Sequence, residues 1–372
     1  MTRRGRWIGA ILALALLSAS CSSTATGGLG RSDGTATGGA TSIPRAKISF
    51  REVDAAMTKR VNDFGLPGAA DLVVRDGTIR HDQTYGSYNR STKVPIASAS
   101  KWLTSALLLT LVDENLLALD APVSTYLPEW SGNKQAITLR LLLSHHAGIP
   151  GSAGCLGDSQ MTLRDCANDI ATKPLDYPVG TEFHYGNAGY TVAAAAAEAV
   201  TNKDFTTLFR ERITSPIGMP DTTFPEGRSG PPSANPLTAA GAVSTLDDYA
   251  KFVTVMAALG VTPDGRRILS EASVREIEKD QVKGLDTRAD FAVQITNFPT
   301  YGLGVWRDRS AATDETQMIS GSGSVGFYPW IDRERHAYGV LLVNDGAGGG
   351  GRAVRESSRI VHDLILPALD NS

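Results

Sequence analysis

The chain is poor in the residues that build metal and nucleic-acid sites. Among 372 residues it has three cysteines and six histidines, and its formal net charge is −3 with 20% charged residues. No histidine spacing accompanies the cysteines, so we expect no metal site. The near balance of charge predicts no nucleic-acid surface. We therefore expect a small-molecule partner. The length is sufficient for one large domain or two ordinary ones.

The N-terminus has the pattern of an export signal. Three arginines precede an apolar segment at 7–17, small residues follow, and Cys21 comes next. The apolar segment is too short to span a bilayer as a mature helix. The residues just before Cys21 resemble a bacterial lipobox. Residues 1–21 are thus expected to be a lipoprotein signal, with Cys21 lipidated and the protein held on the outer face of a bacterial cell membrane. Cleavage to a free secreted protein is the alternative.

Residues 22–42 are rich in Ser, Thr, Gly and Ala, which predicts a flexible linker before a domain at 43–372. The linker contains Gly-Arg-Ser-Asp-Gly at 30–34, a formal match to the Gly-x-Ser-x-Gly nucleophile elbow. That elbow needs a strand before it and a helix after it. The linker offers neither, so we reject the match.

Cys155 and Cys166 remain as an even pair if Cys21 is lipidated. In an exported protein such a pair favours a disulfide. Two free thiols are the alternative.

Hydrophobic periodicity predicts strands near both ends of the domain and helices between them. The expected strands are 69–75, 78–88, 301–306, 324–331 and 337–343, and the expected helices include 48–64, 188–200, 205–217, 247–259 and 355–366. This order predicts an α+β fold, in which one antiparallel sheet is assembled from both chain ends, flanked by helices, with a mainly helical domain inserted.

Ser98 and Lys101 precede a long apolar run. If that run is a helix entered at Ser98, the two side chains share one face and a hydroxyl faces an amine. The unpaired N–H groups of a helix N-terminus would favour a developing alkoxide. A serine before an apolar helix is also an ordinary N-cap, so the pair needs companions elsewhere.

Tyr185 and Asn187 are such companions, because in extended backbone they project to the same side. Either Lys101 or an ionised Tyr185 could take the Ser98 proton, and a Lys/Tyr pair could share one proton. In either case the pKa of the group that accepts the proton, Lys101 or Tyr185, must be lowered. A polar loop with a buried tyrosine is the alternative.

Gly-Ala-Gly-Gly-Gly-Gly at 346–351 satisfies Gly-x-Gly-x-x-Gly. A dinucleotide site needs a further strand with an acidic residue about twenty positions on. None follows, so we expect no nucleotide and no other cofactor.

Six motifs in fixed order resemble the β-lactamase-related serine hydrolases, which include class C β-lactamases, D-Ala-D-Ala carboxypeptidases and family VIII carboxylesterases. The motifs are Ser98-Ala99-Ser100-Lys101, the Leu-Leu-Ser-His-His-Ala-Gly-Ile-Pro segment at 142–150, Tyr185-Gly186-Asn187, 241–248, 301–305 and Gly326-Phe327.

This resemblance implies roles for the residues above. Ser98 would be the acylated nucleophile, Lys101 and Tyr185 would share acid and base work, and Asn187 would bind substrate or orient Lys101. The oxyanion hole would consist of the Ser98 N–H and an N–H on the strand near Gly323, in the stretch formed by Ser322, Gly323 and Ser324.

One motif departs from the family pattern. The family has Lys-Thr-Gly or His-x-Gly before Gly-Phe, whereas this chain has Ser320 or Gly321 in the cation's place, depending on the register. That cation pairs with a substrate carboxylate. Its absence favours neutral esters or amides over penicillins and peptide termini.

The sequence therefore predicts an exported serine hydrolase acting on an ester or amide of small-molecule or cell-envelope origin. A non-catalytic, anchored binding protein that retains the fold is the alternative. The histidines, including His145 and His146, are assigned structural roles, since both precede Gly148 where helix capping would suffice.

Overall fold

The computed structural model describes residues 48–372 apart from 226–233, 297, 310–315 and 347, and these residues belong to one compact unit. The predicted signal, Cys21 and the linker lie outside the described residues.

The elements follow one another in three groups. The first contains α1 (Phe50–Asp63), β1 (Gly68–Arg75), β2 (Thr78–Gly86), β3 (Val94–Pro95), the 3-10 turn η1 (Ala97–Ala99) and α2 (Ser100–Asp113). The second contains η2 (Val123–Thr125), η3 (Gly132–Lys134), α3 (Leu139–Leu143), α4 (Leu163–Thr172), α5 (Ala188–Thr201), α6 (Phe205–Phe209), the π-turn η4 (Arg210–Thr214) and α7 (Ser215–Ile217). The third contains β4 (Val243–Ser244), α8 (Leu246–Ala257), α9 (Glu271–Glu278), α10 (Phe291–Thr296), β5 (Thr300–Tyr301), β6 (Trp306–Arg309), β7 (Thr316–Ser320), β8 (Tyr328–Asp332), β9 (Ala337–Val343), α11 (Gly350–Ile360), the π-turn η5 (Val361–Ile365) and α12 (Leu366–Asp370).

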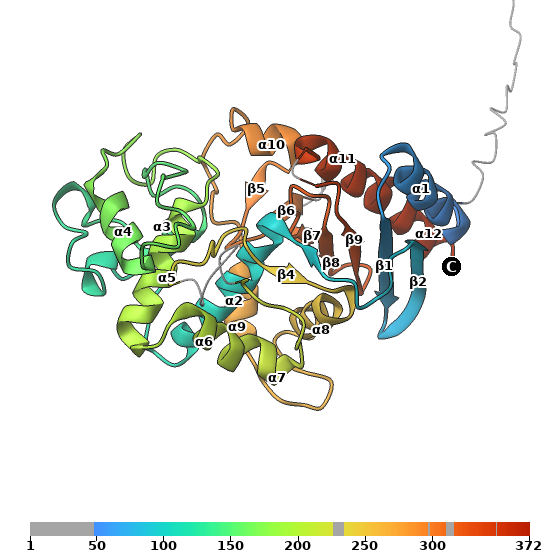
Figure 1. Ribbon diagram of the computed structural model, residues 1–372, viewed down its shortest axis with the longest axis horizontal. Coiled ribbons are helices and arrows are strands. Elements are labelled where there is room, and N and C mark those ends of the chain that lie inside the picture. The colour runs from blue at the N-terminus through green and yellow to red at the C-terminus, as the bar shows by residue number, and fades with distance from the viewer. Residues whose placement is uncertain (1–47, 226–233, 297, 310–315, 347) are drawn as a thin grey trace, which may run out of the picture. The chain divides into compact units, whose positions relative to one another are not determined.

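The main sheet joins the two ends of the fold (Figure 1). Its strand order is β2-β1-β9-β8-β7-β6-β5, with every neighbouring pair antiparallel. Strand β1 from the start pairs with β9 from the end, so that Ala69 lies opposite Val343. The predicted antiparallel sheet with an inserted helical region is therefore confirmed.

Strand β1 is buried on both faces because helices cover the sheet on either side. Ala70, Leu72 and Val74 pack into the same cluster as the side chains of α2 and α8. Ala69 and Val73 point to the other face and pack with side chains of α1, α11 and α12. The alternation of strand side chains thus gives three layers, helix, sheet and helix.

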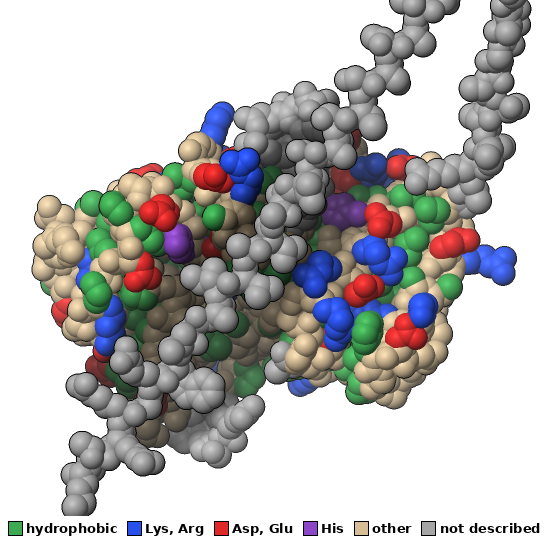
Figure 2. All heavy atoms as spheres, turned by 90° about the horizontal axis from the view of Figure 1, so that it is seen from above, with side chains coloured by type: hydrophobic (Ala, Val, Ile, Leu, Met, Phe, Trp, Pro, Cys, Tyr) green, Lys and Arg blue, Asp and Glu red, His purple; other side chains and the backbone are tan. Residues whose placement is uncertain are grey.

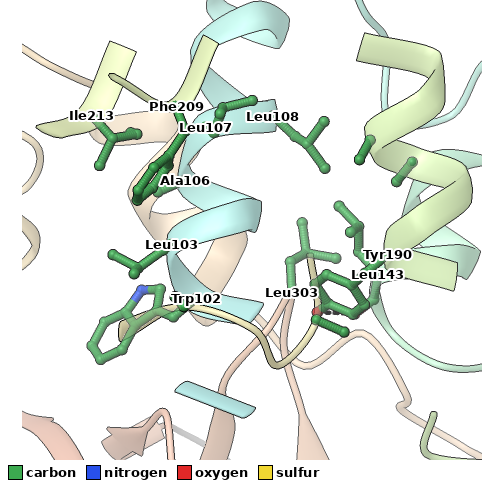
Figure 3. Close-up of a cluster of buried hydrophobic side chains, with 14 of the residues drawn as sticks. Trp102, Leu103, Ala106, Leu107, Leu108, Leu143, Tyr190, Phe209, Ile213 and Leu303 are labelled. Carbon is green, nitrogen blue, oxygen red and sulfur yellow. Dashed lines mark hydrogen bonds between the residues drawn. The ribbon is translucent and has the colours of Figure 1, made fainter. Parts of the chain in front are cut away.

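Helix α2 is surrounded by protein along nearly its whole length, and its residues from Ser100 to Leu111 are all buried. Figure 3 shows its apolar side chains pointing to Phe209 and Ile213 on one side and toward Leu143 and Tyr190 on the other. The sequence of α2 has apolar residues around the whole circumference of the helix rather than along one stripe. The helix that follows the candidate nucleophile is thus fixed by packing from every direction.

Cys155 and Cys166 form a disulfide that ties the loop before α4 to the helix itself. Closing a loop of this length contributes about 3 kcal/mol in the chain-entropy model. Helix α4 packs against α5, which starts at Ala188 immediately after Asn187. The disulfide therefore stiffens the helical region that supports Asn187.

The predicted strand 78–88 ends two residues early, at Gly86, and two other predicted strands differ more from the structure. Residues 301–306 were expected to be one strand, but β5 ends at Tyr301 and β6 begins at Trp306. Between them Gly304 has φ +86°, and a Cβ there would lie 2.7 Å from the Lys101 carbonyl oxygen. The chain turns at this point because its backbone packs directly on α2.

The predicted strand 324–331 starts only at Tyr328, because a turn precedes it. The Gly326 N–H closes that turn by donating to the Gly323 carbonyl at 2.8 Å. At the C-terminal end, the helix expected from residue 355 already begins at Gly350, inside the glycine run.

The surface shows no large field of one sign on the face seen in Figure 2. There, basic and acidic side chains of the described residues are interspersed with hydrophobic ones. Over the described part of the chain, every helix is too short or too polar to cross a bilayer.

Candidate active site

Ser98 lies in the turn η1, two residues before α2 begins at Ser100, rather than in the α-helix itself. The residue before it, Ala97, has φ +46°, a left-handed conformation that costs a non-glycine residue free energy. The Ser100 hydroxyl supports the turn by donating to the Ala97 carbonyl at 2.7 Å, and the Tyr249 hydroxyl donates to the Ala99 carbonyl at 2.9 Å. The Ser98 N–H is among the first of the helix, which have no intrahelical partner.

Lys101 is fully buried, and its ammonium donates to three oxygen atoms. These are Ser98 Oγ at 3.3 Å, Asn187 Oδ1 at 2.8 Å and the Ala239 carbonyl at 3.3 Å. All three belong to neutral groups. Burial therefore lowers the pKa of Lys101 to about 7. An amine that is partly neutral at neutral pH, next to a serine hydroxyl, can act as a general base.

Tyr185 lies on the other side of the same serine. Its hydroxyl interacts with the Ser98 and Tyr301 side chains, and its ring stacks on Trp306 with centroids 5.2 Å apart. Lys101 Nζ lies 4.6 Å from the centroid of the Tyr185 ring. Burial raises the pKa of Tyr185 to about 12, against the opposing effect of its bonds to Ser98 and Tyr301. Tyr185 is therefore a phenol at neutral pH and can donate a proton.

The backbone of Tyr185-Gly186-Asn187 is fixed at three consecutive N–H groups. The Tyr185 N–H donates to Asp290 Oδ2 at 2.9 Å, the Gly186 N–H to His145 Nδ1 at 3.3 Å and the Asn187 N–H to the Gly151 carbonyl at 2.7 Å. A Cβ on Gly186 would lie 2.4 Å from the Gly151 backbone. Two loops therefore meet with no room for a side chain, and this contact sets where Tyr185 and Asn187 point.

Sequence reasoning missed the position of His145. His145 does follow the end of α3 as expected, with φ +64° and with the His146 N–H donating to the Leu141 carbonyl at 3.1 Å. The sequence did not show that the His145 ring lies 4.5 Å from the Tyr185 ring and 4.9 Å from the Tyr301 ring, measured between centroids. The Leu-Leu-Ser-His sequence was the available signal. Nothing local in it shows that the fold places residue 145 beside residue 185.

The stretch after β7 runs past the nucleophile. A Cβ on Gly323 would lie 2.2 Å from the Ile96 carbonyl oxygen and 3.5 Å from the Ala97 side chain. Only glycine, which has no Cβ, permits this close approach. The packing thus favours the register in which Ser322-Gly323 ends the motif and Gly321 stands where the cation would be.

The Gly323 N–H is not directed at the nucleophile, because it donates to the Phe327 carbonyl at 2.8 Å. The Gly321 N–H likewise donates to Pro329, on the β8 side. Strand alternation puts the Ser322 N–H on the opposite edge. Strand β6 does not pair with this edge beyond Ser320, because β6 begins at Trp306, opposite Ser320. Ser324 lies in the following turn and is exposed.

Side-chain carbon atoms of Trp102 and Pro329 pack against Gly321, the residue at the position of the missing cation. A Cβ on Gly321 would lie 3.0 Å from Trp102 Cε3 and 3.4 Å from Pro329. Trp102 is fully buried directly after Lys101. A side chain at position 321 would thus crowd the buried indole ring.

No three His, Cys, Asp or Glu side chains within the described ranges are arranged to hold a metal ion. The chemistry that the described groups offer is that of a serine, a buried amine and a phenol.

A protein-family model described as Beta-lactamase matches residues 53–362, which is most of the chain. The chain belongs to the Beta-lactamase family. Members of this family are serine hydrolases that include esterases and peptidases.

Individual Beta-lactamase-like proteins show the same relationship. Over 191 residues the chain is 27% identical to Protein flp of Staphylococcus aureus strain MW2, a match that covers 47% of this chain and 38% of flp. The chain thus spans less than half the length of that relative. A putative beta-lactamase from Bacteroides dorei has a TM-score of 0.75 at 28% identity, covering 86% of this chain and 99% of the other. EstCE1, described as a hydrolase with promiscuous acyltransferase activity, has a TM-score of 0.69 at 22% identity, covering 84% and 98%; it shows the fold alone.

Proposed function

We propose that this protein is a serine hydrolase that forms an acyl-enzyme on Ser98 and acts on neutral esters or amides. The observation that carries the proposal is the buried Lys101 amine, 3.3 Å from Ser98 Oγ, with a pKa of about 7. A serine is a weak nucleophile until a base takes its proton. Here the amine is available as that base at neutral pH.

The acylation step follows from these positions. Lys101 Nζ takes the Ser98 proton as Oγ attacks the substrate carbonyl, and the Ser98 and Ser322 N–H groups stabilise the negative oxygen that forms. The bond to the leaving group then breaks, and the leaving oxygen or nitrogen receives a proton from the Tyr185 phenol or the Lys101 ammonium. A water molecule, deprotonated by the same groups, releases the acid and regenerates Ser98.

The absence of a cation at position 321 supports the choice of neutral substrates. A β-lactam or peptide terminus presents a carboxylate, which needs a cation for strong pairing. At this position the chain has Gly321, packed against the fully buried ring of Trp102. Amides and esters without a carboxylate lose nothing there.

Export and lipid attachment through Cys21 remain part of the proposal. The Cys155–Cys166 disulfide supports an oxidising compartment, where such bonds persist. Palmitate labelling of Cys21, with Cys21→Ser as control, tests the attachment.

The central test combines active-site labelling with three substrates. A fluorophosphonate should modify Ser98, located by mass spectrometry, and Ser98→Ala should abolish both labelling and turnover. Ser131→Ala changes an exposed serine with no side-chain capping bond and should behave as wild type.

Among p-nitrophenyl butyrate, nitrocefin and a D-Ala-D-Ala peptide, the ester should be hydrolysed fastest. Faster cleavage of nitrocefin or the peptide would contradict the substrate class. Turnover that survives Ser98→Ala, or the absence of both labelling and turnover, would contradict the hydrolase and favour the binding-protein alternative.

A further inference from the structure

We propose that His145 is a positioning residue that works as a neutral imidazole, with Nδ1 unprotonated, to hold Tyr185-Gly186-Asn187 against Ser98 and Lys101. This inference rests on the proposed serine hydrolase function and adds to it a residue outside the Ser/Lys/Tyr set.

The backbone of the Tyr185 loop lies along His145. The His184 N–H donates to the His145 carbonyl at 2.9 Å, and the Gly186 N–H donates to His145 Nδ1 at 3.3 Å. Residue 145 thus binds two N–H groups that flank Tyr185, one with its backbone and one with its ring. Gly186 is the link between Tyr185 and Asn187, so the ring nitrogen fixes the peptide on which both functional side chains depend.

The ring is enclosed by aromatic side chains. Centroid distances are 4.5 Å to Tyr185, 4.9 Å to Tyr301, 5.6 Å to Tyr190 and 5.8 Å to Phe183. His145 has φ +64°, an uncommon conformation for a non-glycine residue. This left-handed conformation is that of the residue after the C-cap of α3, where the His146 N–H donates to the Leu141 carbonyl at 3.1 Å.

The bond to Gly186 assigns the tautomer. A backbone N–H can donate to Nδ1 only if that nitrogen carries a lone pair, so the proton of the neutral ring is on Nε2. His145 Nε2 is buried and has no hydrogen-bond partner among the described residues. A second proton would have to enter at Nδ1, where it would face the Gly186 N–H and break the bond.

The surroundings keep the ring neutral. Among the described residues, its titratable neighbours are Lys101 from α2, the adjacent His146, and the tyrosines Tyr177, Tyr185, Tyr190 and Tyr301, and none of these is a carboxylate. Burial, together with the nearby Lys101 and His146, holds the pKa of His145 well below 6.5. The acceptor at Nδ1 is thus retained across the neutral and mildly acidic range.

Two substitutions at His145 distinguish the effect of the hydrogen-bond acceptor from the effect of the ring's volume. Asparagine places an oxygen at the δ position and tolerates positive φ, whereas glycine tolerates the same φ but offers no acceptor. His145→Gly should lower kcat for p-nitrophenyl butyrate by roughly 100-fold with KM changed less than about threefold. His145→Asn should recover at least about a tenth of wild-type kcat, and added imidazole should partly restore His145→Gly.

The matched control is His146→Asn, since His146 is also buried but bonds through Nδ1 to the Ser144 hydroxyl. It should keep kcat within about threefold of wild type. Melting temperatures of all variants show whether each one folds, and ¹⁵N NMR of the wild type at pH 5.5 should show an unprotonated Nδ1.

The outcomes are distinct. A protonated Nδ1, or a folded His145→Gly with wild-type kcat, overturns the positioning role while the hydrolase stands if Ser98→Ala is inactive. Turnover that persists in Ser98→Ala overturns the hydrolase itself. An equal loss of kcat in His145→Asn and His145→Gly also overturns the positioning role, because the hydrogen-bond acceptor at the δ position would then have no effect.

Discussion

In the proposed mechanism, Lys101 and Tyr185 divide the acid and base work through the difference between their pKa values. The sequence left open whether the two share one proton. The structure gives an amine with a pKa of about 7 and a phenol with a pKa of about 12. The phenol thus keeps its proton while the amine titrates, which supports Lys101 as the base and Tyr185 as a donor.

The pH dependence of turnover should report the Lys101 amine. Because the neutral amine is the active form, kcat/KM for an uncharged ester should rise about tenfold per pH unit below 7 and level off above it. Lys101→Arg stays protonated at every accessible pH and should be inactive throughout. A profile that is flat between pH 5 and 8, or one with a midpoint near 10, would contradict Lys101 as the base.

At the scale of single residues, the motifs located most of the site. Ser98, Lys101, Tyr185 and Asn187 were chosen from sequence, and the structure brings them together. His145 could not be chosen in this way. A histidine after a short helix is explained equally well by capping, and only the packing of two distant loops puts its ring on the Gly186 N–H.

Among the elements, the connection between β7 and β8 governs how closely the sheet approaches the nucleophile. Gly323→Ala places a methyl group 2.2 Å from the Ile96 carbonyl oxygen, so the connection must move away from Ser98. We expect kcat to fall roughly 100-fold, because displacements near 1 Å have effects of that size.

Gly154→Ala is the control for this change, since its Cβ would meet no atom within 4 Å. The test is to measure kcat and the melting temperature of both variants. Activity of folded Gly323→Ala near the wild-type value would show that this approach does not define the site.

Element bounds failed where tertiary contacts break a regular pattern. The alternation at 301–306 reads as one strand, yet the backbone at Gly302 and Gly304 packs on α9 and α2 and must turn. By contrast, β9 has the predicted bounds, because it is a buried strand whose apolar run is continuous and ends at polar residues. Local periodicity therefore predicts the bounds of a buried strand such as β9, but it does not predict a break that packing imposes, as between β5 and β6.

For the molecule as a whole, a buried ion pair connects the first helix to the last part of the chain. Arg60 in α1 bonds Asp345 at 3.0 Å, and their side chains are 2% and 0% exposed. Arg60 also donates to Ser357, whose hydroxyl donates to the Gly326 carbonyl at 2.6 Å. Asp345 has a second partner, Arg352, at 3.0 Å. The network thus supports the turn that carries Gly323 from beneath.

Arg60→Met should destabilise the fold by about 3 kcal/mol, because it leaves Asp345 buried with one partner fewer. Lys59→Met is the matched control. It removes an exposed pair with Asp63, whose side chains are 73% and 47% exposed, and should cost less than about 0.5 kcal/mol. Urea unfolding measures both, and equal effects would contradict a structural role for the buried pair.

The sequence predicted the overall architecture because strand patterns at both ends and helices between them permit few arrangements. It did not predict the Arg60 network, since charged residues are normally exposed and no local pattern reveals a buried partner more than two hundred positions away.

The pairing of β1 with β9 also constrains how the protein folds. Strand β1 acquires its central neighbour only when residues 337–343 exist, long after β1 itself has been made. Contacts between such distant segments form slowly, because the intervening chain must first be closed into a loop. Until then β1 has an unpaired edge. A chain still being made therefore lacks the completed sheet against which α2 packs, and we expect the proposed active site to form only after β9 is in place.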